Sequence, residues 1–448
     1  MIAAKGLFFQ TTFSWIVISI LVVWLHESDH HHHPMGVQAL SSLAPTAAAS
    51  SPLFRYCPPP QGPNDQQATT TTALQGTVIS SVEDGDDLHS TTTTTKVNVQ
   101  ALQELGYPNG LCRALSQAAQ VYAKRYWIID DSLSMSTKDG HFLLHTPQKH
   151  GKEDRIEQAP CSRWNELQET VLQHSLLALH LEIPTDFRLL NHAAGHFRIP
   201  RTLGHKQRSS LPSPLTDVQH AQKLLSRTKP RGVTPLTARL RTVHKELSQS
   251  VLPKLESNKK VAIVLATDGL PTNADDHGSS TLQAKQDFHQ ALKALPEQQI
   301  SVVIRLCTDD TDVVSYYNQL ATNLPHVQVL DDYWAEAEQV QAHNPWLNYG
   351  LVLHRIREMG CCGHVPLLSA LAQRPLTPDE VAEFVAFVLD WRHEIPPTWD
   401  NLVQTVDQHA NDVNAHVWNP MTGQMDPWFD LKKYHIAEEA CPQQPLLP

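Results

Sequence analysis

The sequence lacks the patterns that mark several common enzyme classes and disulfide-bonded domains. It has no G-x-x-x-x-G-K-[ST] phosphate loop and no G-x-S-x-G nucleophile elbow, which argues against a P-loop nucleotide hydrolase and an α/β-hydrolase. Its seven cysteines are scattered and include no Cys-x-x-Cys pair, so we expect reduced thiols and no structural zinc site. No Asn is followed two residues later by Ser or Thr. The missing N-glycosylation pattern favours an intracellular domain.

Positive charge is also in short supply. The 35 Lys and Arg residues are outnumbered by 46 Asp and Glu residues, which gives a formal net charge of -11. A nucleic-acid-binding protein needs a basic surface that neutralises phosphates, so we expect no nucleic-acid partner. Hydrophobic residues make up 41% of the 448 residues, which is enough to fill the core of one large domain or of two modest ones.

Residues 1–26 are predicted to form a membrane-anchor or signal-like segment. An apolar run extends from Leu7 to Leu25, and its length suits a short transmembrane helix or the core of a signal peptide. No small-residue cleavage pattern follows it closely, so we expect a single-pass membrane protein that is anchored through this run. The alternative is a cytoplasmic protein whose translation begins at Met35.

Three further segments differ in composition. Residues 27–96 are rich in Thr, Ser, Pro and Ala and cannot bury enough apolar surface to offset the entropy of ordering, so we expect a disordered linker. Residues 97–343 alternate between helix and strand patterns and are expected to form the main domain, with a helical lead-in. Residues 344–448 are expected to form a mostly helical, Trp-rich C-terminal extension.

The main domain contains a predicted strand that ends in hard oxygen donors. Residues 126–129 are aromatic or β-branched, which predicts a buried parallel strand. Asp130, Ser132 and Ser134 follow it as the pattern D-x-S-x-S. Ligands bind at the carboxyl edge of open α/β sheets, and carboxylate and hydroxyl oxygens suit Mg²⁺, so this stretch predicts a metal site. The alternative is a turn in which these side chains bond to their own backbone.

Two later stretches carry matching oxygen donors. Thr234 lies in a Gly-Val-Thr-Pro loop ahead of a long helical pattern, and Asp268 ends a second apolar strand, which begins at Lys260. Because Thr followed by Pro is a standard helix start, Thr234 has an alternative role as a helix cap. Together with the D-x-S-x-S stretch, these residues resemble the von Willebrand factor type A domain and its metal-ion-dependent adhesion site. The resemblance covers about half of the chain, residues 120–335.

The resemblance implies a specific metal site and a specific fold. The metal ligands would be Asp130, Ser132, Ser134, Thr234 and Asp268. The metal would be Mg²⁺, or alternatively Mn²⁺ or Ca²⁺. The fold would be a Rossmann-like α/β domain with a doubly wound, mainly parallel sheet. The alternation of strand and helix patterns along the main domain predicts the same fold class independently.

The hydrophobic periodicity also predicts the bounds of many elements. The expected strands include Asp186–Asn191, His196–Ile199, Ile300–Leu306 and Val327–Leu330, and the expected helices include Leu111–Ala123, Thr216–Arg227, Gln283–Leu295 and Asp312–Leu324. The polar stretch from Met135 to Ala159 is expected to be a long loop insertion.

The extension carries two local signals. Thr377-Pro378-Asp379-Glu380 has the pattern of a capping box with Pro at the first helical position, and residues 417–429 predict a small hairpin. Four tryptophans of the extension could either bind a peptide or pack the extension against the main domain, and we favour the packing role. They are Trp391, Trp399, Trp418 and Trp428.

The donor set of the predicted metal site favours binding over catalysis. Mostly neutral oxygen ligands leave a divalent cation partly uncompensated, so the cation attracts a carboxylate from outside instead of activating water. We therefore expect a non-enzymatic adhesion or scaffold module whose Mg²⁺ captures an Asp or Glu of a partner protein. The alternatives are a phosphoesterase-like metal-dependent hydrolase that uses the same acidic site, and a scaffold whose metal is only structural.

Overall fold

The computed structural model describes residues 97–146, 155–192, 195–200, 215–273, 279–360, 365–391, 396, 398–409 and 415–434. Two predictions lie outside these described residues: the membrane anchor at residues 7–25 and the linker at residues 27–96. Within the part of the chain that is described, no helix has the length and apolar character needed to cross a membrane.

A six-stranded sheet lies at the centre of the main domain, in the order β5-β4-β1-β6-β7-β8. Its strands are β1 (Tyr122–Ile129), β4 (Thr185–Leu189), β5 (His196–Ile199), β6 (Lys260–Thr267), β7 (Ile300–Leu306) and β8 (Val327–Leu330). Every pairing is parallel except that of β5 with β4 at one edge. This topology confirms the predicted α/β class with a mainly parallel sheet.

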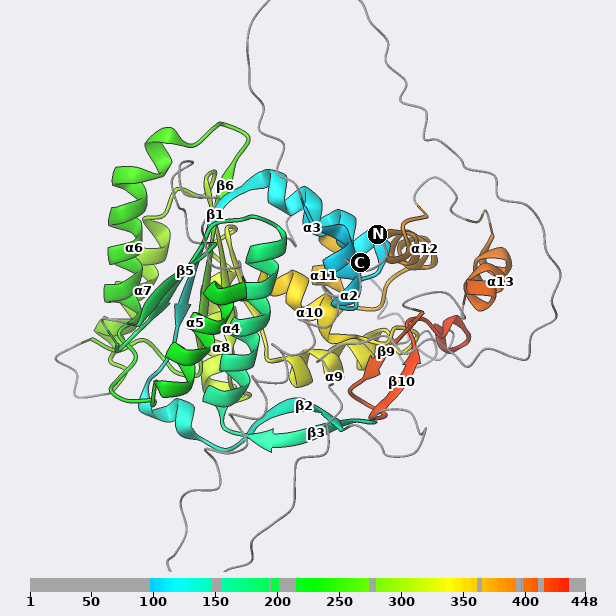
Figure 1. Ribbon diagram of the computed structural model, residues 1–448, viewed down its shortest axis with the longest axis horizontal. Coiled ribbons are helices and arrows are strands. Elements are labelled where there is room, and N and C mark those ends of the chain that lie inside the picture. Colours follow the sequence, from blue (N-terminus) through cyan, green and yellow to red (C-terminus); the bar gives the residue numbers. More distant parts are fainter. Residues whose placement is uncertain are drawn as a thin grey trace, which may run out of the picture.

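Helices cover both faces of the sheet, as β1 illustrates. Its side chains alternate between the faces: Tyr126 and Ile128 pack on one side, Trp127 and Ile129 on the other, and all four are fully buried. Burying each such side chain stabilises the fold by about 1.5–3 kcal/mol. The first face is covered by α6 (Leu236–Ser250), α7 (Leu282–Lys293) and α8 (Thr311–Ala321), and the second by α4 (Arg163–His180) and α5 (Leu215–Arg227) (Figure 1).

The extension shares a third hydrophobic cluster with the lead-in helices. Figure 1 shows α10, α11 and α12 of the extension beside α2 and α3, with α13 farther out, on the side of the sheet away from α6. The elements are α2 (Val99–Glu104), α3 (Asn109–Val121), α9 (Tyr333–His343), α10 (Leu351–Glu358), α11 (Pro366–Ala370), α12 (Pro378–Leu389), α13 (Trp399–Gln408), β9 (His416–Asn419) and β10 (Gln424–Pro427). The expected packing of the extension on the main domain is therefore present.

Local signals in the extension were predicted correctly. Thr377 and Glu380 form the capping box at the start of α12, and β9 pairs with β10 as an antiparallel hairpin. Trp418 and Trp428 are buried, so these two indoles belong to the core and are not available to a peptide.

The expected loop insertion at Met135–Ala159 is wrong. A short 3-10 helix, η1 (Leu133–Ser136), follows the D-x-S-x-S stretch, and β2 (Gly140–Thr146) then pairs antiparallel with β3 (Arg155–Cys161). Only part of this hairpin is buried, and its polar and His-rich residues conceal the period-2 pattern that normally identifies a strand.

A buried ionic network ties α10 to α4 and to the sheet. The carboxylate of Glu358, which is fully buried, accepts hydrogen bonds from His174 Nε2 (2.8 Å), Arg355 Nη1 (2.8 Å) and Arg305 Nε (3.3 Å). Burial opposes its ionisation, but the charge of Arg355 and the hydrogen bond from His174 hold the pKa of Glu358 well below its ordinary value. Arg305 of β7 also pairs with Glu166, in the first turn of α4, at 2.6 Å. This network fixes the start of α4 against the sheet.

Asn344 is the polar junction of the extension and is fully buried. Its Nδ2 donates to the carbonyls of Leu371 (2.8 Å) and Arg374 (3.0 Å). Its Oδ1 accepts from the N–H of Leu376 (3.0 Å) and from Trp346 Nε1 (3.2 Å). All four hydrogen bonds join segments that follow α9.

Replacing Asn344 by Asp should lower the free energy of unfolding by about 2 kcal/mol or more, because a buried carboxylate cannot donate to the two carbonyls. Urea denaturation would measure the change. Asn318→Asp makes the same substitution at an exposed position of α8 and should alter stability by no more than about 0.5 kcal/mol. Equal losses in the two variants would contradict the role of Asn344.

Candidate metal centre

The carboxyl ends of β1 and β6 lie side by side at one edge of the sheet. The two strands pair in parallel, with Ile129 opposite Ala266, and the N–H of Asp130 donates to the carbonyl of Ala266 over 2.9 Å. Asp130 and Asp268 therefore follow adjacent strand ends. The sequence predicted this convergence correctly.

Asp130 is fully buried, and both of its carboxylate oxygens are hydrogen-bonded. Its Oδ1 accepts from the N–H of Ser132 (2.8 Å), and its Oδ2 accepts from Thr267 Oγ1 (2.5 Å). The hydrogen bond from the N–H of Ser132 forms the local turn that we considered as an alternative to a metal site. The turn is present, and the oxygen donors cluster beside it as well. Thr267 was not predicted, although its place directly before Asp268 at a strand end could have indicated it.

The two serines connect the first strand end to the second. Ser132 Oγ and Ser134 Oγ lie 3.0 Å apart, and Ser134 Oγ donates to Asp268 Oδ1 over 2.8 Å. Ser132 and Asp268 are buried, whereas Ser134 is exposed. The oxygen cluster is thus open to solvent on the Ser134 side.

Thr234 does not cap the helix that follows it. Helix α6 begins at Leu236, and its N-terminus has no side-chain cap. The backbone of Thr234 is instead held by Thr272, whose Oγ1 accepts from the N–H of Thr234 (3.1 Å) and whose N–H donates to its carbonyl (3.0 Å). The predicted alternative role as a helix cap is therefore wrong.

The hydroxyl of Thr234 lies against the residue that follows Asp268. A Cβ atom built on Gly269 would stand 3.3 Å from Thr234 Oγ1, closer than most real Cβ contacts, so glycine at this position allows the approach. Gly232, with φ of +77°, supplies the turn before Thr234, and its carbonyl accepts from the N–H of Leu133 over 3.2 Å. The loop that carries Thr234 thus contacts both strand ends.

Two buried acidic side chains lie close together in this cluster. Burial, and then the nearby charge of Asp268, raises the pKa of Asp130 from its ordinary 3.8 to about 7. Burial also raises the pKa of Asp268, although hydrogen bonds from Ser134 and Arg163 oppose the shift. These two buried carboxylates resist ionisation and lie beside the hydroxyls of Ser132, Ser134 and Thr234. Together they form an oxygen donor set that fits a hard divalent cation.

Only two carboxylates take part in the cluster. Among the described residues, no group of three or more His, Cys, Asp and Glu side chains comes together as a metal site. A metal held here would therefore take its remaining ligands from hydroxyls, water or a partner.

Two charged side chains, those of Arg163 and Asp131, adjoin the cluster. Arg163 Nη1 donates to Asp268 Oδ2 over 3.0 Å. Asp131, next to Asp130 in the chain, is bonded elsewhere: its Oδ1 accepts from the N–H of Asn191 over 2.7 Å, and its Oδ2 pairs with His192. Asp131 therefore holds the end of β4 and contributes no donor to the cluster.

Three buried cysteines of the described residues, Cys112, Cys161 and Cys307, are free. Burial raises the pKa of each thiol to about 12. Because the thiolate is the reactive form, none of the three is suited to act as a nucleophile.

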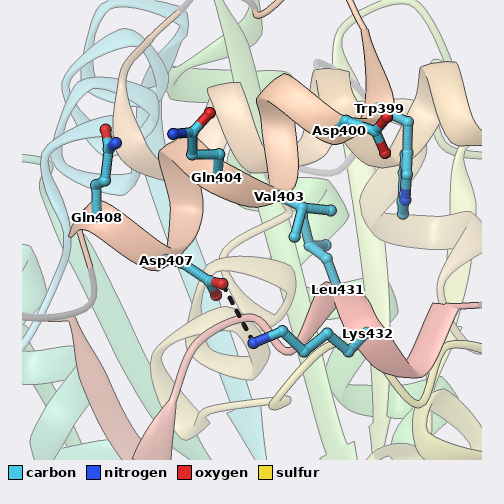
Figure 2. Close-up of a pocket in the computed structure, with 8 residues that line it drawn as sticks. All are labelled: Trp399, Asp400, Val403, Gln404, Asp407, Gln408, Leu431 and Lys432. Atoms are coloured by element: carbon cyan, nitrogen blue, oxygen red, sulfur yellow. Dashed lines mark ion pairs between the residues drawn. The ribbon is translucent and has the colours of Figure 1, made fainter.

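A separate hollow of about 640 Å³ lies between α13 and the short 3-10 helix η5 (Leu431–Lys433) (Figure 2). Trp399 and Leu431 contribute apolar surface to it, and Asp407 pairs with Lys432 Nζ at 3.2 Å across it. Its lining includes no residue of the oxygen cluster, so it forms no part of the candidate metal centre.

No family model matches the chain, and no curated protein matches it significantly. One solved structure with a similar chain is the crystal structure of manganese-loaded Plasmodium vivax TRAP protein. The two are 15% identical, the similarity covers 47% of this chain and 68% of that chain, and the TM-score is 0.28.

The raised pKa of Asp130 predicts how the metal-free protein responds to pH. The folded state holds this proton up to about pH 7, whereas the unfolded state loses it near 3.8. The contribution of Asp130 to stability therefore falls as the pH rises through this window and levels off above it. Asp130→Asn removes the titration and keeps the shape of the side chain.

In EDTA, the melting temperature of the parent should fall relative to that of Asp130→Asn as the pH rises from about 5 to about 8. Calorimetric melts of both proteins across this range would measure the difference, and titrating groups that do not interact with Asp130 cancel in the comparison. A difference that does not change with pH would contradict the assigned environment of Asp130.

Proposed function

We propose that this chain is a metal-dependent protein-binding module of the von Willebrand factor A type. In this proposal, Mg²⁺ is held at the carboxyl edge of the sheet and captures an Asp or Glu side chain of a partner protein. The observation that carries the proposal is the convergence of two buried carboxylates and three hydroxyls at this edge. The proposed ligands are Asp130, Ser132, Ser134, Thr234 and Asp268.

The donor set supports binding of a carboxylate ligand. Two carboxylates and neutral hydroxyls leave the coordination shell of a divalent cation incomplete, so a further oxygen ligand can bind the ion. Ser134 is exposed, so a ligand can approach from its side.

A metal-dependent hydrolase has less support. That alternative needs a further carboxylate as nucleophile or base, and Asp131, the nearest candidate in sequence, is bonded to Asn191 and His192. Residues 26–30 have the sequence His-Glu-Ser-Asp-His, which matches the H-E-x-x-H pattern of zinc proteases. These residues lie outside the described part of the chain.

The proposal is tested by partner capture on immobilised full-length protein, in Mg²⁺ and in EDTA. We expect proteins that are retained in Mg²⁺ and released by EDTA. Asp130→Asn should lose this capture at least about tenfold, because one anionic ligand is removed. Ser134→Ala should lose less, since water can replace a hydroxyl.

Ser136→Ala is the matched control, because Ser136 is an exposed serine of the same 3-10 helix. This variant should capture partners like the parent. A retained partner should in turn lose binding when an exposed Asp or Glu of its contact segment becomes Asn or Gln. Capture that is equal in Mg²⁺ and EDTA, or unchanged in Asp130→Asn, would refute the proposed function.

A further inference from the structure

The rim of the candidate metal centre carries a positive charge that belongs to the chain itself. Arg163, the first residue of α4, donates from Nη1 to Asp268 Oδ2 over 3.0 Å, and its side chain is only 15% exposed. The other edge of the guanidinium, Nε and Nη2, donates to both carboxylate oxygens of Asp139, at 2.8 and 2.5 Å. Arg163 thus stands between a buried carboxylate of the site and a second carboxylate outside it.

The backbone fixes the position of Arg163. Its N–H donates to the carbonyl of Thr137 over 3.0 Å, and the N–H of Thr137 donates to the carbonyl of Ser134 over 2.9 Å. Ser162 caps α4 by accepting from the N–H of Asn165 over 3.2 Å. The start of α4 is therefore tied directly to the D-x-S-x-S loop, and the guanidinium is pre-organised at the site.

The two carboxylates of the site differ in their partners. Asp130 accepts hydrogen bonds from neutral donors, the N–H of Ser132 and the hydroxyl of Thr267. Asp268 accepts one neutral bond from Ser134 and one charged bond from Arg163. Within the described part of the chain, the guanidinium of Arg163 is thus a cation in direct contact with the site.

We propose that Arg163 is the resident counter-cation of the candidate metal centre. It neutralises Asp268 when no metal is bound, and a divalent cation must compete with it for the same carboxylate. This inference rests on the proposed function, because the metal site itself is proposed. Repulsion between the guanidinium and the ion makes metal affinity lower than the oxygen ligands alone would give, while the metal-free fold gains stability.

The test is a calorimetric titration of the full-length protein with Mg²⁺. Arg163→Gln should bind Mg²⁺ about tenfold more tightly than the parent, because a unit positive charge next to the ion is removed. Arg241→Gln, the matched control, removes the same charge from an arginine of α6 that is 59% exposed, and should bind like the parent. In EDTA, Arg163→Gln should melt below the parent, and saturating Mg²⁺ should close the gap.

Arg163→Lys is a second variant that keeps the charge and should bind Mg²⁺ within about threefold of the parent. If the parent binds and Arg163→Gln binds no more tightly, the inference is overturned while the metal site stands. If Arg163→Gln binds Mg²⁺ and the parent does not, the inference is supported and the proposed function of the native chain fails. If neither binds, both are overturned.

Discussion

The structure depends on the burial of two carboxylates at the ends of adjacent parallel strands. The pairing of β1 with β6 holds Asp130 and Asp268 at one edge of the sheet. Because this pairing is made by the backbone, a change of side-chain rotamer cannot separate the two strand ends. Burial disfavours both negative charges. Three neighbouring groups lower this cost by donating hydrogen bonds to the carboxylates. They are the hydroxyls of Thr267 and Ser134 and the guanidinium of Arg163.

The rest of the fold keeps this edge rigid. Helices cover both faces of the sheet, so β1 is buried from Arg125 to Ile129 and β6 from Val261 to Thr267. A rigid scaffold lets loops hold ligands in fixed positions. The extension adds a second constraint through Glu358, which joins α10 to His174 of α4 and Arg305 of β7. Arg305 also pairs with Glu166, three residues after Arg163. The ionic network of the extension thus supports the helix that carries the rim charge.

The sequence predicted the features of the fold that depend on local residue patterns. The bounds of β7 and β8 were correct, and the adjacent ends of β1 and β6 followed from apolar runs that stop in a carboxylate. It did not predict Arg163 or Glu358, because one decisive partner of each, Asp268 and His174 respectively, lies more than 100 residues away in the chain. It also missed the β2–β3 hairpin, whose polar residues hide strand periodicity.

The central claim is that a divalent cation binds at the ionised carboxylate of Asp130. Its pKa of about 7 without metal means that binding near pH 6.5 must release a proton. Titration calorimetry with Mg²⁺, in two buffers of different ionisation enthalpy, counts that proton. We predict release of about half a proton or more per ion by the parent. Asp130→Asn should release clearly less, because only Asp268 of the two carboxylates can still give up a proton. Undetectable binding by the parent, or binding without proton release, would contradict the account.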